Sequence, residues 1–154
     1  MKSLIVLMVF FPLSLMQCAE EDFDKYYFND NPTIESLNGT WKVISFENYT
    51  EQTVEFKNQE NSWGNDIIII FDDSKNPHEL SGINTTNSIF GEFEYTGPRQ
   101  FKLHHLSTTH VNQPSWANNF NQAILDEDVH FIISQNRLRI FYDQQAKSVT
   151  LTRI

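Results

Sequence analysis

The 154-residue chain has one cysteine, five glycines and five prolines, and it carries only eleven Lys and Arg residues against twenty Asp and Glu. One cysteine cannot form an internal disulfide. The sequence shows no glycine-rich phosphate loop and no Gly-x-Ser-x-Gly nucleophile motif. The formal net charge is −9 and no Lys/Arg cluster is visible, which argues against nucleic acid as a partner, because phosphate binding needs a basic face.

Apolar and aromatic residues are plentiful by comparison. Hydrophobic residues make up 40% of the chain, and thirteen of them are Phe. This content is sufficient for a real hydrophobic core, and the length allows one domain with a short tail.

The N-terminus has the layout of a secretory signal. Lys2 precedes an apolar run from Leu4 to Leu15, which is too short to span a bilayer comfortably. The run ends in Met16-Gln17-Cys18 and resembles a bacterial lipoprotein signal, although Gln17 replaces the usual small residue. The resemblance implies a signal peptide at 1–17, cleavage before Cys18 and acylation of its thiol. The alternative is an ordinary signal with an incidental cysteine.

An acidic segment follows the cysteine. Glu20, Glu21 and Asp22 resemble the acidic export signal of surface lipoproteins in Bacteroidetes, and the alternative is a solvated, self-repelling tether. We therefore expect residues 18–35 to form an acidic tether. Two or more acyl chains anchor a protein stably, so the expected location is the bacterial cell envelope, in the outer membrane and exposed at the surface.

The domain proper, residues 36–154, reads mainly as short strands. Apolar patterning and turn residues predict strands at 40–47, 53–57, 66–71, 79–83, 88–96, 100–111, 129–134, 137–142 and 148–154. The strand at 66–71 is expected to be covered on both faces. Residues 115–126 show helical spacing, with Ser115 as the expected cap. The fold class is therefore mainly β: an antiparallel barrel or strongly bent sheet of about seven or eight strands with one inserted helix.

Several stretches resemble the META domain family in order and spacing. They are LNGTWKVISFE at 37–47, LSGINTTNSIFGEFEY at 80–95, FKLHHLSTT at 101–109 and the final VTLTRI. The resemblance implies a small β-rich domain with an embedded helix, of a type common in envelope lipoproteins. Ile83 takes the position of a family cysteine, so a function that depends on the family's cysteine pair is not expected.

A second resemblance competes with the first. Gly39-Thr40-Trp41 is the Gly-x-Trp that opens lipocalins, and Arg153 on the last strand is placed to stack on Trp41 as an arginine does in that fold. This resemblance implies a barrel that binds a small apolar ligand. Lipocalins place their helix after the barrel strands, whereas here three strands are expected after the helix.

The histidines do not suggest a metal site. His104 and His105 are adjacent on an expected strand, so they point to opposite faces and cannot hold one ion together. His105 shares its parity with Phe101 and Leu103, which places it on the core or pocket side. No metal and no cofactor is expected.

Aromatic residues complete the candidate contacts. Trp63 lies in a polar loop at 58–65 and is expected to be exposed, whereas Trp116 is expected to plug the core. Trp63 and His105 are the candidate contacts for a protein partner or a small apolar ligand. No catalytic residue is assigned, because an acylated Cys18 cannot act as a thiolate. The sequence thus predicts a lipid-anchored, non-catalytic domain with an interaction or envelope-maintenance role.

Overall fold

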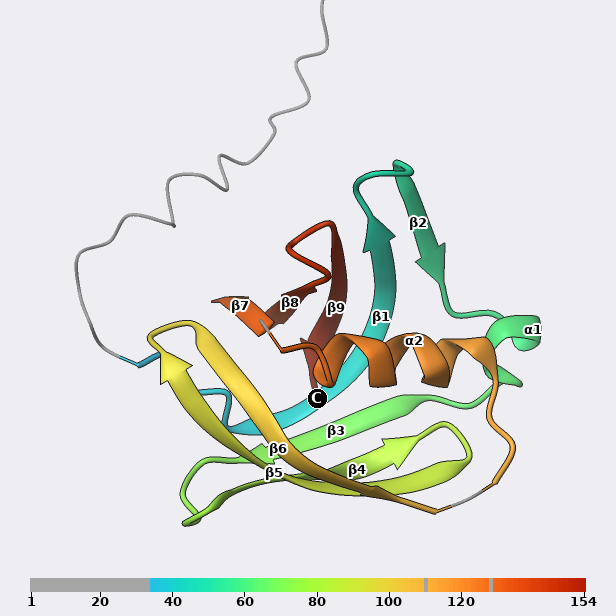
Figure 1. Ribbon diagram of the computed structural model, residues 1–154. Helices are drawn as coiled ribbons and strands as arrows, with labels where there is room; N and C mark the ends of the chain where they lie inside the picture. The colour runs from blue at the N-terminus through green and yellow to red at the C-terminus, as the bar shows by residue number, and fades with distance from the viewer. Residues whose placement is uncertain (1–33, 110, 128) are drawn as a thin grey trace, which may run out of the picture. The chain divides into compact units, whose positions relative to one another are not determined.

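The computed structural model describes residues 34–154 apart from His110 and Asp128. The predicted signal peptide and nearly all of the acidic tether lie outside these residues. The elements in chain order (Figure 1) are β1 (Gly39–Asn48), β2 (Thr53–Phe56), α1 (Gln59–Ser62), β3 (Ile67–Asp72), β4 (His78–Asn84), β5 (Asn87–Gly97), β6 (Gln100–Thr108), α2 (Ser115–Ile124), β7 (Val129–Ser134), β8 (Arg137–Tyr142) and β9 (Lys147–Arg153).

Eight of the strands form a closed antiparallel barrel, which confirms the predicted fold class. The strands pair in the order β1-β3-β4-β5-β6-β7-β8-β9, and β9 pairs with β1 to close the ring. If β2 is left out of the order, each strand pairs with the next strand along the chain, so the barrel is an up-and-down meander. Closure satisfies the strand edges that an open sheet would expose.

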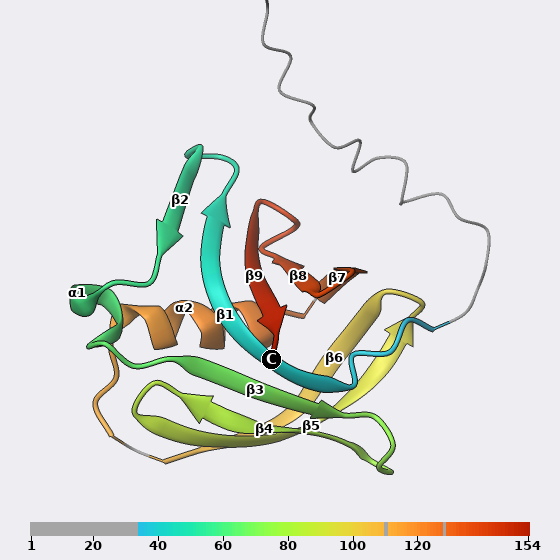
Figure 2. The ribbon, with the colours of Figure 1, turned by 180° about the vertical axis from the view of Figure 1, so that it is seen from behind.

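The first strand takes part in three pairings. Residues 39–42 of β1 pair with β3, and residues 45–48 pair with β2 on the same side. Between them, a register shift from Val43 to Ser45 interrupts the pairing with β9. An irregularity of this kind bends a strand. The β1–β2 hairpin consequently projects beyond the barrel (Figures 1 and 2).

Side chains occupy the interior of the barrel. Phe71, Phe93 and Phe101 are buried and meet edge to face, with ring centroids 5.4–6.0 Å apart. Phe131 extends the group from β7, 6.0 Å from Phe101. An eight-stranded barrel has an interior about wide enough for side chains to fill, and large aromatic residues fill it efficiently.

The inserted helix lies on the concave side of the sheet and packs against β8 and β9 (Figures 1 and 2). Its apolar stripe is buried, and the ring of Trp116 meets Phe46 edge-on at 4.6 Å. The prediction that Trp116 plugs the core is confirmed. The expected cap is wrong: Pro114 is the N-cap, no side chain caps the helix, and Ser115 is already its first residue.

Two other local expectations also need correction. The outer face of β3 is not covered, because Ile70 is 43% exposed. The loop expected at 58–65 contains the short helix α1, since Asn58 and Asn61 form a reciprocal capping box that stabilises one helical turn.

A clasp of four residues joins the two ends of the domain. Trp41 donates its indole N–H to the Leu37 carbonyl at 2.8 Å, and the Arg153 guanidinium lies 4.3 Å from the centre of its ring. Arg153 also donates to the Asn38 carbonyl at 3.0 Å. Gly39 makes the close approach possible, because a Cβ there would lie 2.5 Å from the guanidinium and its φ is +138°. The predicted stacking of Arg153 on Trp41 is confirmed.

Arg153→Ala is expected to destabilise the domain by about 1 kcal/mol, since it removes a cation–π contact. The measurement is the free energy of unfolding in urea. Arg137→Ala on β8, where the side chain is exposed, changes the net charge equally and serves as the control. Equal stabilities of the two variants would contradict a contribution from the clasp.

Candidate functional site

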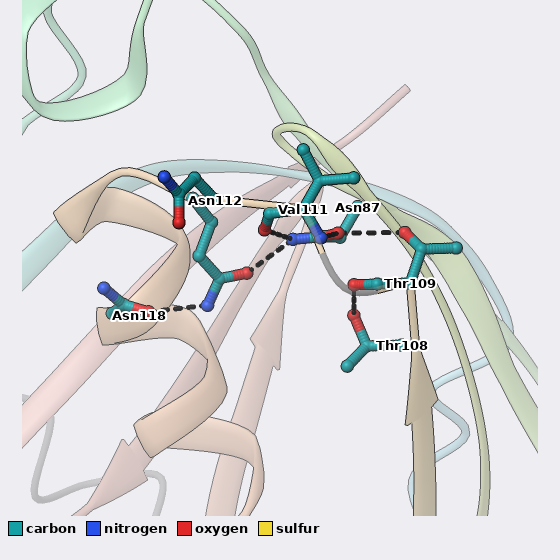
Figure 3. Close-up of a pocket in the computed structure, with 7 residues that line it drawn as sticks. Asn87, Thr108, Thr109, Val111, Asn112 and Asn118 are labelled. Atoms are coloured by element: carbon teal, nitrogen blue, oxygen red, sulfur yellow. Dashed lines mark hydrogen bonds between the residues drawn. The ribbon is translucent and has the colours of Figure 1, made fainter.

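A polar hollow opens between the end of β6, the loop that follows it and the first turns of α2 (Figure 3). Its volume is about 360 Å³ and it is open to solvent. The described residues of its walls have amide and hydroxyl side chains, with one valine, and none of these residues is charged. The lining residues are Asn87, Thr108, Thr109, Val111, Asn112, Gln113 and Asn118.

Asn87, the first residue of β5, organises the hollow. Its side chain is almost fully buried. The amide nitrogen donates to the Val111 carbonyl and to Gln113 Oε1, each at 2.9 Å. The amide oxygen accepts from the Thr109 hydroxyl and the Val111 N–H, each also at 2.9 Å. All four bonds hold the loop after β6 against β5, so the walls are fixed before any ligand arrives.

The helical wall leaves polar groups available. Gln113 donates to Asn118 Oδ1 at 2.5 Å (Figure 3). The Asn118 side chain is exposed, and its Nδ2 group has no hydrogen-bond partner among the described residues. The Asn112 side chain is exposed, and it has no hydrogen-bond partner among the described residues. Helix α2 brings no acidic residue in its first turn. The hollow therefore offers both donors and acceptors without a net charge.

The β4–β5 hairpin is hydrogen-bonded to the helix and to the loop that line the hollow. Asn84 is fully buried and donates to the Ala117 carbonyl at 3.2 Å and to Asn121 Oδ1 at 2.7 Å, both in α2. In the turn, the Thr86 hydroxyl donates to the Asn112 carbonyl at 2.9 Å. Helix, hairpin and loop are thereby joined by one hydrogen-bond network.

The described ionisable groups whose pKa values are shifted are not among the residues that line the hollow. Hydrogen bonds from Lys42 and Lys57 hold the pKa of Asp66 below its usual value, with Nζ–Oδ distances of 2.8 and 2.5 Å. Burial raises the pKa of Tyr95. Its hydroxyl donates to Asp73 at 2.9 Å. These contacts have structural explanations and contribute nothing to the walls of the hollow.

Trp63 has the exposure that the sequence predicted. It ends α1 in the left-handed conformation, with φ of 53°, and 47% of it is exposed. It is not among the residues that line the hollow. Its role as a contact for a partner stays a prediction.

His105 lies on the other side of the sheet from the one expected. Phe93 pairs with Leu103, but Glu92 pairs with His105, so β6 has one extra residue at this point. This bulge reverses the alternation, and His105 is exposed and hydrogen-bonded to Ser107 at 2.9 Å. The structure places Trp63 and His105 on different elements: Trp63 follows α1, which packs against α2, whereas His105 lies on β6.

The other described histidines have separate partners. His104 lies 2.9 Å from Glu94 on β5, and the His78 ring lies beside Phe93 and Tyr95. Within residues 34–154 without His110 and Asp128, no three His, Cys, Asp or Glu residues are grouped so that they could hold a metal ion. In the same part of the chain, no helix is both long and apolar enough to cross a bilayer.

The four residues that the sequence assigns to anchoring and export lie outside the described part of the chain. They are Cys18, Glu20, Glu21 and Asp22. Their roles stay predictions.

Sequence reasoning missed the hollow. The stretch from Ser107 to Asn119 is rich in Asn, Gln and Thr, and its first part was expected to continue a strand to residue 111. Strand β6 ends at Thr108 because the next residues bond to the side chain of Asn87 instead. The only signal was a run of amide and hydroxyl residues, which is equally typical of a solvated loop.

Comparison with known proteins identifies the fold but no family. No protein-family model matches the chain, and no curated protein matches it. An NMR structure of a protein from Burkholderia xenovorans superposes with a TM-score of 0.60 at 12% identity, over 82% of this chain and 99% of that one. A crystal structure of a DUF4847 family protein from Bacteroides vulgatus gives 0.53 at 16% identity, over 75% and 92%. At these identities the likeness concerns the fold alone.

Asn87→Ala is expected to destabilise the domain by about 2 kcal/mol and to speed hydrogen exchange at the Val111 amide. The reason is that the Val111 N–H loses its acceptor, the Asn87 Oδ1 atom. Asn87→Asp keeps the acceptor oxygen but places a carboxylate beside the Val111 carbonyl and Gln113 Oε1, so it should destabilise too. Urea unfolding and amide exchange measure both effects. Asn136→Ala, in an exposed turn, is the control, and unchanged exchange at Val111 in Asn87→Ala would contradict the network.

Proposed function

We propose that the chain is a lipid-anchored protein of the bacterial cell envelope whose barrel is a non-catalytic binding domain. The observation that carries the anchoring is the position of the single cysteine. Cys18 stands where a short apolar run ends and an acidic segment begins, as in lipoprotein signals. Acyl chains on this thiol would hold the mature chain at the membrane, and the proposed site of residence is the outer membrane.

The spacing between anchor and barrel supports the proposal. At the N-terminal end, Glu35 already belongs to the barrel, because its N–H donates to the Pro98 carbonyl at 3.0 Å. Residues 18–33 therefore remain as a spacer, which could span about 50 Å when fully extended. Its acidic residues would be exported with it and would favour display at the cell surface.

The contacts within the barrel support a binding role rather than a catalytic one. Many carboxylates bond to neighbouring groups of the domain: Asp66 pairs with Lys42, Asp73 accepts from Tyr95, and Glu94 pairs with His104. The polar hollow beside α2 is open and its walls are held by hydrogen bonds. A domain with such a surface recess is suited to recognition without chemistry.

A lipocalin-like relationship has more support from the architecture than the META resemblance. Lipocalins are eight-stranded up-and-down barrels, and the meander order and the stacking of Arg153 on Trp41 agree with that pattern. The helix between β6 and β7 departs from it. An apolar ligand inside the barrel, the alternative function, would have to displace Phe71, Phe93 or Phe101, so we place binding on the outer surface.

Cys18→Ser is expected to move the protein from the detergent phase to the aqueous phase, because the acylated thiol is lost. Phase partitioning of the protein made in its bacterial host measures this. Asn29→Ala, a substitution in the spacer that leaves the cysteine intact, is the control. Unchanged partitioning of Cys18→Ser would refute the lipid anchor.

Replacement of Glu20, Glu21 and Asp22 by Ala should leave the protein in the detergent phase but protect it from protease added to intact cells. The physical reason is that export depends on the acidic segment, whereas acylation depends on Cys18. Western blotting after protease treatment gives the readout. If the triple variant is digested as readily as the unaltered protein, the acidic segment is a tether and not an export signal.

A further inference from the structure

We propose that the hollow around Asn87 binds a neutral saccharide. The inference rests on the proposed function, since it names the ligand class of a barrel already proposed to be a binding domain. It is based on the composition of the walls and on the hydrogen bonds that hold them. The walls belong to β5, β6, the following loop and α2.

The chemistry of the lining selects a neutral, hydroxyl-rich ligand. Three asparagines, one glutamine and two threonines supply donors and acceptors in the same wall. Sugar hydroxyls both donate and accept hydrogen bonds. An amide side chain can accept a hydrogen bond from them through its oxygen and donate one to them through its nitrogen. An anion would meet no cationic side chain among the described residues that line the hollow, and it would approach a chain with a formal net charge of −9. A cation would find no carboxylate ligand there.

The groups required for recognition remain available. Thr108, Asn112 and Asn118 are exposed lining residues of the hollow (Figure 3). The Asn112 side chain and the Asn118 Nδ2 group have no hydrogen-bond partner among the described residues, and the Thr108 hydroxyl, which donates to the Thr109 carbonyl, can still accept. Val111 is 56% exposed and supplies an apolar surface for the C–H face of a sugar ring. A binding site that combines a few polar groups with an apolar contact fixes both the orientation and the identity of a ligand.

The walls are organised before binding. The four hydrogen bonds of Asn87 fix the loop at Thr109, Val111 and Gln113, and Asn84 fixes α2 to the β4–β5 hairpin. A preformed site loses little entropy when a ligand enters, which matters for saccharides because each of their hydrogen bonds replaces one to water. The volume, about 360 Å³, lies near the lower end of small-molecule sites and suits a mono- or disaccharide.

The test is a titration of the ¹⁵N-labelled full chain, followed by NMR at the side-chain amide signals of Asn112 and Asn118. The probes are glucose, galactose, mannose, N-acetylglucosamine and cellobiose, with glucuronate and glucosamine as charged counterparts. At least one neutral sugar is expected to shift both amide signals saturably, with a dissociation constant in the millimolar range. The charged counterparts should bind at least several-fold more weakly.

Two variants locate the binding. Asn112→Ala removes a side chain that has no hydrogen-bond partner among the described residues and should weaken binding about tenfold without altering the fold. Asn118→Asp keeps the acceptor for Gln113 but replaces the free donor by a charge, and it should weaken binding further. Asn136→Ala, remote from the hollow, should bind as the unaltered chain does, and the remaining amide signals report whether each variant is folded.

Three results would overturn the proposal. They are the absence of a saturable shift with every neutral probe, equal binding of glucuronate, and shifts that persist unchanged in Asn112→Ala and Asn118→Asp. The anchor is tested separately, because Cys18→Ser changes partitioning and leaves the hollow intact. Failure of the saccharide titration and failure of the lipid anchor can therefore be told apart.

Discussion

The pairing of β1 with β9 is the contact on which the rest of the structure depends. Only this pairing turns a meander of strands into a closed ring, and the Trp41–Arg153 clasp lies at one end of it. Closure limits the interior to the volume that side chains from eight strands can fill. The closely packed aromatic core follows from that limit.

The surface recess forms next to the shortest strand pairing of the ring. Strands β6 and β7 pair over only two residues on each strand, Gln100 with His130 and Phe101 with Val129. The chain between them leaves the sheet, forms α2 and returns. A loop joins the end of β6 to the start of α2, and Asn87 fixes this loop from the neighbouring strand β5. The hollow forms where this loop, held against β5 by Asn87, meets the first turns of α2.

A single-residue irregularity in β6 separates an expected face from the observed one. Strand periodicity identified the positions of the strands well, since alternation of apolar residues survives over five or six residues. The bulge opposite Glu92 and Phe93 moved His105 from the core side to the outer side. A bulge shifts every later residue by one position, and no residue type in the sequence signals it reliably.

The sequence by itself determined the mainly β class, the inserted helix, the burial of Trp116 and the stacking of Arg153 on Trp41, because these depend on local periodicity and on one specific residue pair. It also predicts the anchor at Cys18 from a local motif. Only the tertiary structure decided the register, the outward side of His105 and the hollow around Asn87. Each of these depends on residues more than ten positions apart, and a run of Asn, Gln and Thr has the same composition whether it forms a solvated loop or the wall of a site.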